Sequence, residues 1–117
     1  MGTPAINDEV LTVSCEKTND QISINFDTLR RSVLTLRAIN HQLRQEIIAL
    51  LDKDGRMTVT ELYIKLRLEQ SVASQHLAIL RRAGVLKTER DGKFIYYSIN
   101  KDRLKEISGF IEDLVNN

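Results

Sequence analysis

The chain has 117 residues, of which 42% are hydrophobic and 28% charged, with five glycines and one proline. This length suits one domain of ordinary size, and the low glycine and proline content favours a helical globule over disorder. The longest aliphatic run, residues 47–51, is far shorter than the roughly 18 residues that a membrane span needs. Because the first residues also lack the basic-then-apolar pattern of a signal peptide, we expect a cytoplasmic protein with no membrane partner.

A single cysteine, Cys15, cannot form an internal disulfide, which fits a reducing compartment. The formal net charge is only +1, but the charges are segregated along the chain. Residues 1–29 carry one base and five acids, net −4, whereas residues 65–105 carry ten bases and four acids, net +6. The basic segment is a candidate nucleic-acid reader, and the alternative is a merely solvated surface.

The first predicted element is a flexible tail over residues 1–22, which show no periodicity, so the folded domain is expected over residues 23–117. An amphipathic helix then follows, because apolar residues step by +3, +4 and +3 at Phe26, Leu29, Val33 and Leu36. A second helix is predicted over residues 43–51, and Asp54-Gly55 closes it as a turn.

A helix-turn-helix pair is predicted next. Thr58-Val59-Thr60-Glu61 fits a capping box and opens a third helix, and a short link at Leu68-Glu69 leads into a fourth. The fourth helix has a stripe for burial at Ala73, Leu77 and Leu80, and Gly84 ends it. Its other face is short and polar and consists of Ser71, Ser74, Gln75, Ala78 and Arg82. Such a face can hydrogen-bond to bases and phosphates in a major groove.

A β-hairpin is predicted after this helix, with strands at residues 86–90 and 93–99 around Asp91-Gly92, a pair that favours a type I′ turn. At its tip, Arg90 and Lys93 are placed to contact phosphates or an adjacent minor groove. We expect Tyr96 and Tyr97 to pack against the domain, since strands favour aromatic residues for packing alone.

A last helix is predicted after Asn100, which can cap it. Its apolar residues repeat the spacing of the first helix, at Leu104, Ile107, Ile111 and Leu114, with Phe110 beside them. The apolar stripes of the first and last helices must be buried against another surface, and a twofold dimer of these helices would bury both. The alternative is a monomer that buries them internally. Two recognition helices about 34 Å apart could then read a palindromic operator.

The chain resembles the ArsR-type winged helix-turn-helix repressors over roughly residues 40–100. The residues that carry the likeness are Gln70-Ser71, Ser74, His76-Leu77, Leu80, Ala83-Gly84-Val85, Gly92 and Tyr96-Tyr97. The resemblance implies a mainly helical fold with a small β-hairpin, a homodimer, and double-stranded DNA as the partner.

The predicted DNA-binding residues are Gln70, Ser71, Ser74, Gln75, His76, Arg82, Arg90 and Lys93. His76 has two interpretations, because it could donate to a phosphate or sit half-buried and orient the helix; we favour the second.

Many ArsR-type proteins release DNA when they bind a metal. One group uses a Cys-x-Cys pair, where this chain has Tyr63 and Lys65, and another uses ligands between the terminal helices, where it has Lys101, Arg103, Leu114 and Asn117. These are not credible metal ligands, so no metal or other cofactor is expected. The effector stays open between a small molecule between the terminal helices, a redox or protein signal, and control by abundance.

Two other classes of function are less well supported by the sequence. A winged helix can serve as a protein-interaction module without DNA, but the polar Ser/Gln face argues against it. An enzyme is not expected, since the sequence shows no nucleophile and base pair, no phosphate-binding glycine loop and no metal constellation.

Overall fold

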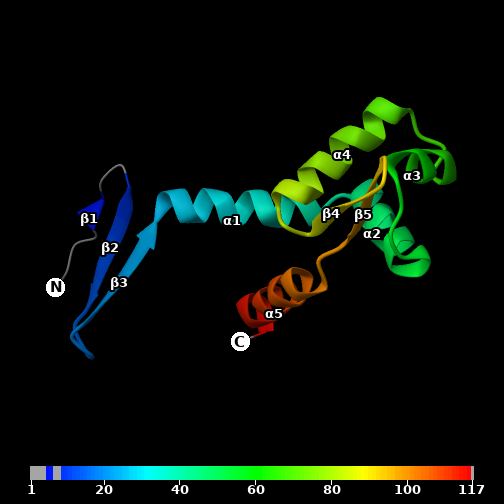
Figure 1. Cartoon of the computed structure of the whole chain (residues 1–117). Coiled ribbons are helices and arrows are strands. Elements are labelled where there is room, and N and C mark those ends of the chain that lie inside the picture. The colour runs from blue at the N-terminus through cyan, green and yellow to red at the C-terminus, as the bar shows by residue number, and fades with distance from the viewer. Residues whose placement is uncertain (1–4, 7–8, 117) are drawn as a thin grey trace. The chain divides into compact units, whose positions relative to one another are not determined.

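The computed structural model describes residues 5–6 and 9–116, and the chain divides into two compact units, Met1–Arg37 and Ala38–Asn117 (Figure 1). The first unit comprises a three-stranded antiparallel sheet in the order β1-β2-β3 and most of one helix. These elements are β1 (Ala5–Ile6), β2 (Val10–Cys15), β3 (Asp20–Asn25) and α1 (Phe26–Ile39). Within the described ranges, none of the helices combines the length and apolar character that crossing a membrane requires.

The sheet corrects the expectation that residues 1–22 lack regular structure. Val10–Cys15 and residues 20–25 pair as neighbouring strands, and Asn19 between them has the left-handed φ of 60°. Apolar and polar residues alternate in both strands, which is the period of a half-buried strand. The expected domain boundary at residue 22 therefore falls inside β3, and the two compact units instead meet inside α1.

The second unit confirms the predicted helix-turn-helix and hairpin. Its elements are α2 (Gln42–Asp54), α3 (Val59–Lys65), α4 (Gln70–Arg82), β4 (Leu86–Asp91), β5 (Phe94–Ile99) and α5 (Lys101–Asn116). The largest fully buried side chains come from α2, α3, α4 and the segment after α4, and they are Ile47, Leu62, Leu77, Leu80 and Val85. This aliphatic core fixes the orientation of α4, because three residues of that helix are anchored in it.

The predicted capping box at the start of α3 is confirmed. The Thr58 hydroxyl accepts from the backbone N–H of Glu61 at 3.2 Å, and the Glu61 carboxylate accepts from the backbone N–H of Thr58 at 3.1 Å. Asn100 likewise caps α5, since its side-chain oxygen accepts from the N–H of Arg103 at 3.2 Å. These caps satisfy backbone donors that a helix start leaves unpaired.

Gly84 ends α4 in a Schellman motif. Gly84 N–H donates to the carbonyl of Arg81 at 2.9 Å, and Val85 N–H donates to that of Leu80 at 3.0 Å. The motif needs a left-handed residue, and Gly84 supplies it with φ 80°. A Cβ at this position would lie 3.3 Å from Nε of Arg103, so glycine also makes room for α5.

The wing differs from its prediction by one residue. Asp91 pairs with Phe94, so the two-residue loop is Gly92-Lys93 and not Asp91-Gly92. Gly92 has φ 64° while Lys93 is not among the residues with positive φ, which is the pattern of a type II′ turn and corrects the expected type I′. Met57 adds an isolated bridge to this ribbon, exchanging two backbone hydrogen bonds with Tyr97.

Candidate nucleic-acid interface

α4 presents two chemically distinct faces. Ala73, Leu77 and Leu80 are at most 1% exposed and lie in the core, as their spacing predicts. The opposite face is exposed and carries the predicted reading residues Gln70, Ser71, Ser74, Gln75 and Arg82, together with Ala78 and Arg81. Arg81 is not in the predicted set. Like Arg82, it is exposed and lies in the last turn of α4, where it is placed to contact a phosphate.

The polar groups of this face are available to a ligand. Among the described residues, the side chains of Ser71, Ser74 and Gln75 form no hydrogen bond with another part of the chain, while Arg82 Nε makes only a 3.3 Å bond to the carbonyl of Ala78 in its own helix. Short side chains with free donors and acceptors, on a helix with two arginines in its last turn, match the chemistry of a major groove edged by phosphates.

His76 connects this helix to α2. Its Nδ1 lies 3.1 Å from a guanidinium nitrogen of Arg44, which can only donate, so Nδ1 accepts and the ring proton is on Nε2. The His41 ring lies 4.9 Å away between centroids. Partial burial first, then the nearby His41 and Arg44, lower the pKa of His76 below its usual value. The half-buried position of His76 fits the orienting role that we favour for it.

The wing tip carries the two predicted cations. Arg90 and Lys93 are both exposed, and Lys93 Nζ lies 5.5 Å from the centre of the Phe94 ring. Phe94 and Ile95 are themselves about half exposed, so the tip combines positive charge with apolar surface. Tyr96 and Tyr97 are half-buried, in line with the packing role expected of them.

Arg56 holds the wing from the loop between α2 and α3, and sequence reasoning did not find it. Its guanidinium bonds to the carboxylates of Glu89 and Asp91, the latter at 2.8 Å, and lies 4.1 Å from the centre of the Tyr96 ring. These contacts set the single positive charge of Arg56 against the two negative charges of Glu89 and Asp91, which lowers the net negative charge that the two acids give the wing. Arg56 is more than 30 positions from Glu89 and Asp91 in the sequence, so no local sequence pattern predicts these contacts.

The terminal helices keep much of their apolar stripes exposed. Of the residues predicted for a dimer interface, Leu29, Val33, Phe110, Ile111 and Leu114 are 40–65% exposed. Phe26, Leu36 and Leu104 are half-buried, and Ile107 is only 6% exposed, which leaves little of it for a partner. Two further residues that the stripes did not include, Leu34 and Val115, are 61% and 74% exposed.

Two of the positions that the resemblance aligns with metal ligands of other ArsR-type proteins have other contacts here. Lys65 forms an ion pair with Asp54, and Arg103 Nε donates to the carbonyl of Ala83 at 3.5 Å. Tyr63 is half-buried, Lys101 and Leu114 are exposed, and Asn117 lies outside the described residues. Over residues 5–6 and 9–116, no group of three histidine, cysteine or acidic residues is close enough to hold a metal ion.

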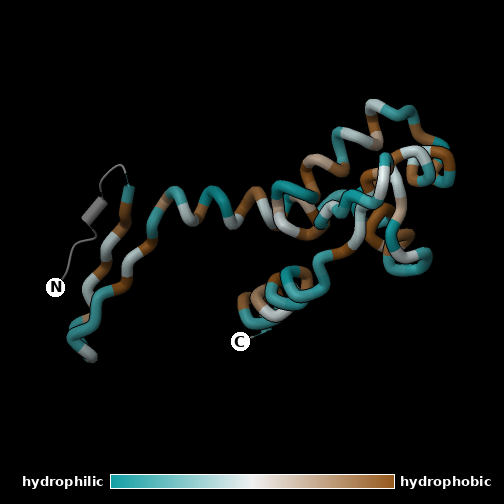
Figure 2. The backbone as a smooth tube through the Cα atoms, in the orientation of Figure 1, coloured by the Kyte–Doolittle hydropathy of each residue, from teal (hydrophilic) through white to brown (hydrophobic). Residues whose placement is uncertain are grey.

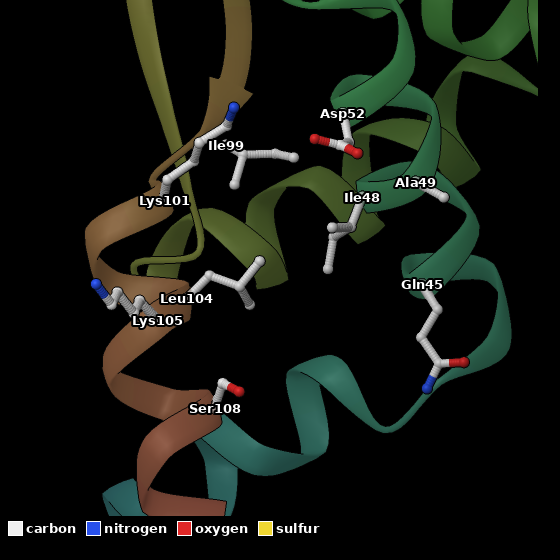
Figure 3. Close-up of a pocket in the computed structure, with 9 residues that line it drawn as sticks. All are labelled: Gln45, Ile48, Ala49, Asp52, Ile99, Lys101, Leu104, Lys105 and Ser108. Carbon is white, nitrogen blue, oxygen red and sulfur yellow. The ribbon is translucent and has the colours of Figure 1, made fainter.

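An open hollow of about 550 Å³ lies between α2, the end of β5 and α5 (Figure 3). Ile48, Ile99 and Leu104 point into it, while Lys101 and Lys105 stand on its α5 side. Its position between α2 and α5 was not foreseen from the sequence. In the described part of the chain, no polar side chain is buried, so none is available to orient a small molecule in this hollow. The hollow alone therefore does not indicate which ligand would bind.

A helix-turn-helix with an exposed polar recognition face and a basic two-stranded wing defines a winged-helix DNA-binding protein. Residues 41–88 match the family model described as "Bacterial regulatory protein, arsR family". The chain is 37% identical to the transcriptional repressor PagR of Bacillus anthracis over 72% of this chain and 84% of that protein. It belongs to the ArsR family and is a DNA-binding transcriptional regulator, not an enzyme.

Two solved structures and one further relative are also similar to this chain. The solved structure of PagR superposes with a TM-score of 0.58 at 36% identity, covering 77% of this chain and 99% of that one. NolR from Sinorhizobium fredii gives a TM-score of 0.61 at 32% identity, covering 77% and 89%. The transcriptional activator HlyU of Vibrio cholerae is 35% identical over 64% of this chain and 68% of its own length.

Proposed function

We propose that the protein is a dimeric repressor that binds a palindromic operator in the cytoplasm. Each protomer places α4 in a major groove, where Ser71, Ser74 and Gln75 read base edges and Arg82 contacts the backbone. The wing tip follows the adjacent phosphates with Arg90 and Lys93. The observation that carries the proposal is the free polar face of α4, held in place by a stripe of side chains that are almost fully buried.

The dimer is supported by the exposed apolar residues of α1 and α5. Phe110, Ile111 and Leu114 occupy one side of α5 and are 40–65% exposed, so they offer a partner an apolar surface to cover. A twofold axis would pair these surfaces with their copies and present two recognition helices to one face of the DNA.

We choose repression because PagR, which is similar over most of its length, is named a repressor. The alternative is activation, because HlyU is named an activator. Regulation by metal is not proposed, since the aligned positions hold side chains that are not metal ligands and two of them are engaged elsewhere. The alternatives are a small molecule, a redox or protein signal, and control by abundance.

Fluorescence anisotropy tests the proposal, with the full chain titrated onto a labelled fragment from upstream of its own coding region and onto a scrambled fragment. We expect nanomolar binding to the native fragment, at least a hundredfold weaker binding to the scrambled one, and affinity that falls steeply with salt. Equal, weak and salt-insensitive binding to both fragments would contradict a DNA-reading function and favour a protein partner for the winged helix.

A further inference from the structure

One face of the wing continues into the core of the second unit. At the base of the ribbon, Leu86 pairs with Ile99, and these two side chains are only 2% and 9% exposed. Side chains alternate between the two faces of a ribbon, so the pair of Arg90 and Ile95, four positions nearer the tip, lies on the same face. We call the face formed by these four residues the inner face, because its base is buried in the core.

The opposite, outer face carries the acids of the wing. β4 is largely hydrophilic, whereas β5 has apolar residues at both ends (Figure 2). The register puts Glu89 and Asp91 together on the outer face, and Arg56 reaches both carboxylates while its guanidinium lies over the Tyr96 ring. One guanidinium against two carboxylates leaves this part of the face with a net negative charge, which DNA phosphates would repel. Lys87 is on the same face but lies nearer the base of the wing.

Each face has one half-exposed apolar side chain near the tip. Ile95 on the inner face is 49% exposed and lies opposite the exposed Arg90. Phe94 on the outer face is 50% exposed and lies opposite Asp91, although Lys93 Nζ is 5.5 Å from the centre of its ring. Only the inner face therefore pairs its apolar side chain directly with a cation.

A cation beside an exposed aliphatic side chain suits the minor groove of DNA. Phosphates line the edges of this groove, and apolar side chains of DNA-binding proteins enter it against sugars and base edges. In the minor groove, A·T pairs present only acceptors, whereas a G·C pair adds the 2-amino group of guanine, which projects into the groove as a donor. An isoleucine over that amino group takes the place of water and offers it no acceptor, so the contact costs free energy at G·C and not at A·T.

We propose that Ile95 is a specificity-determining residue that enters the minor groove beside the segment read by α4 and favours A·T base pairs there. Arg90, opposite it on the inner face, neutralises phosphates at the edge of the groove, and the outer face with Glu89 and Asp91 stays in solvent. The inference rests on the proposed function, since it requires that α4 bind the operator. It gives the wing a sequence preference that its cations alone do not supply.

The test uses anisotropy titrations of the full chain on three versions of the fragment from upstream of its own coding region. Footprinting first locates the protected segment, and about five base pairs, half a helical turn, at each of its ends are then made all A·T, all G·C or all inosine·cytosine. Inosine is guanine without its 2-amino group, so an inosine·cytosine pair has the minor-groove groups of A·T. We expect the wild type to bind the A·T and inosine versions within twofold of each other and the G·C version at least fivefold more weakly.

Two variants assign the preference to one face of the wing. Ile95→Thr keeps a β-branched residue in the strand while it removes apolar surface, and Phe94→Thr makes the matched change at an equally exposed position of the outer face. Ile95→Thr should bind the three versions within twofold of one another, and Phe94→Thr should keep the preference of the wild type. Because the preference is a ratio measured within one protein, a uniform loss of affinity does not alter it.

The outcomes separate this inference from the proposed function. Specific binding of the wild type with equal affinity for all three versions would refute the minor-groove contact alone, and this comparison needs no variant. A preference that survives in Ile95→Thr would overturn the role of Ile95 and assign the preference to Arg90 or to the shape of the groove. A preference lost in Phe94→Thr would place the outer face on DNA and also overturn the inference. Binding to all three versions no tighter than to scrambled DNA would refute the proposed function itself.

Discussion

Arg44 couples the start of α2 to the recognition helix, because its guanidinium donates both to Nδ1 of His76 at 3.1 Å and to the carbonyl of Ala38 at 2.7 Å. His76 can accept this bond only while it is neutral. The hydrogen bond between α2 and α4 therefore depends on the protonation state of His76.

Lower pH is expected to destabilise this arrangement. The pKa of His76 lies below its usual value of about 6.5, through burial first and then through His41 and Arg44. The unfolded chain therefore binds this proton more readily than the folded one, so the stabilisation is fully present above about pH 6.5 and is lost as the pH falls through the native pKa. In urea unfolding between pH 7.5 and pH 5, the wild type should lose more stability than His76→Gln. Identical pH dependence of the two proteins would contradict this.

Removal of the polar groups of α4 is expected to weaken operator recognition without affecting the fold. A good base contact contributes about 1–3 kcal/mol, so Ser74→Ala/Gln75→Ala should weaken operator binding at least tenfold in anisotropy titrations. The matched control is Ser108→Ala/Gln42→Ala, which changes exposed residues on α5 and α2. Sedimentation should give the same dimer constant for both variants. Unchanged operator affinity of the α4 variant would remove this helix from the reading role.

The wing cations are expected to contribute to binding of any DNA sequence. If Arg90 and Lys93 each neutralise one phosphate per protomer, removing one of them should lower the slope of log affinity against log salt by about 0.9 for each phosphate that is no longer neutralised. Arg90→Ala and Lys93→Ala should weaken binding to operator and scrambled DNA alike, whereas Lys105→Ala on α5 serves as a control for the removal of one charge. A salt slope equal to that of the wild type would exclude the wing from the interface.

Arg56 is expected to support DNA binding through the wing. Arg56→Gln leaves Glu89 and Asp91 without their partner, so their charges oppose the phosphates and the ribbon no longer has the guanidinium against Tyr96. We expect several-fold weaker binding to all DNA, and recovery in a triple variant that adds Glu89→Gln and Asp91→Asn. A triple variant as weak as Arg56→Gln would instead indicate that Arg56 touches DNA directly.

The parts of the fold that followed from the sequence are those with local signals. The stripe of Ala73, Leu77 and Leu80, the capping box at Thr58 and the glycine exit at Gly84 each depend on residues within one or two helical turns. They lie where they were expected, because packing and capping favour the same conformation.

The parts that did not follow depend on weaker or longer-range signals. Apolar and polar residues alternate along β2 and β3 as expected of strands, but the turn between them contains no glycine or proline. Asn19 is the residue that adopts the left-handed conformation in this turn. The wing turn is displaced because Gly92 stands first in the loop, although Asp-Gly usually forms the turn itself. The Arg56 contacts join distant segments, and only the folded chain brings them together.

Arg67 offers a last test of how the helix-turn-helix is held. α3 ends in the same motif as α4: Arg67 N–H donates to the carbonyl of Ile64 at 3.2 Å, and Leu68 N–H donates to that of Tyr63 at 2.9 Å. Here the left-handed residue is an arginine with φ 56°, a conformation that costs a side-chain-bearing residue about 1–2 kcal/mol. Glycine avoids this cost but loses more backbone entropy on folding, about 0.5–1 kcal/mol.

We therefore expect Arg67→Gly to raise the free energy of unfolding by about 0.5–1 kcal/mol, measured with urea. The reciprocal change, Gly84→Ala, should lower it by about 1 kcal/mol or more, because it adds both the strain of φ 80° and a Cβ close to Arg103. If Arg67→Gly instead destabilises the chain, the long arginine side chain must contribute packing or charge that outweighs the backbone strain of the turn.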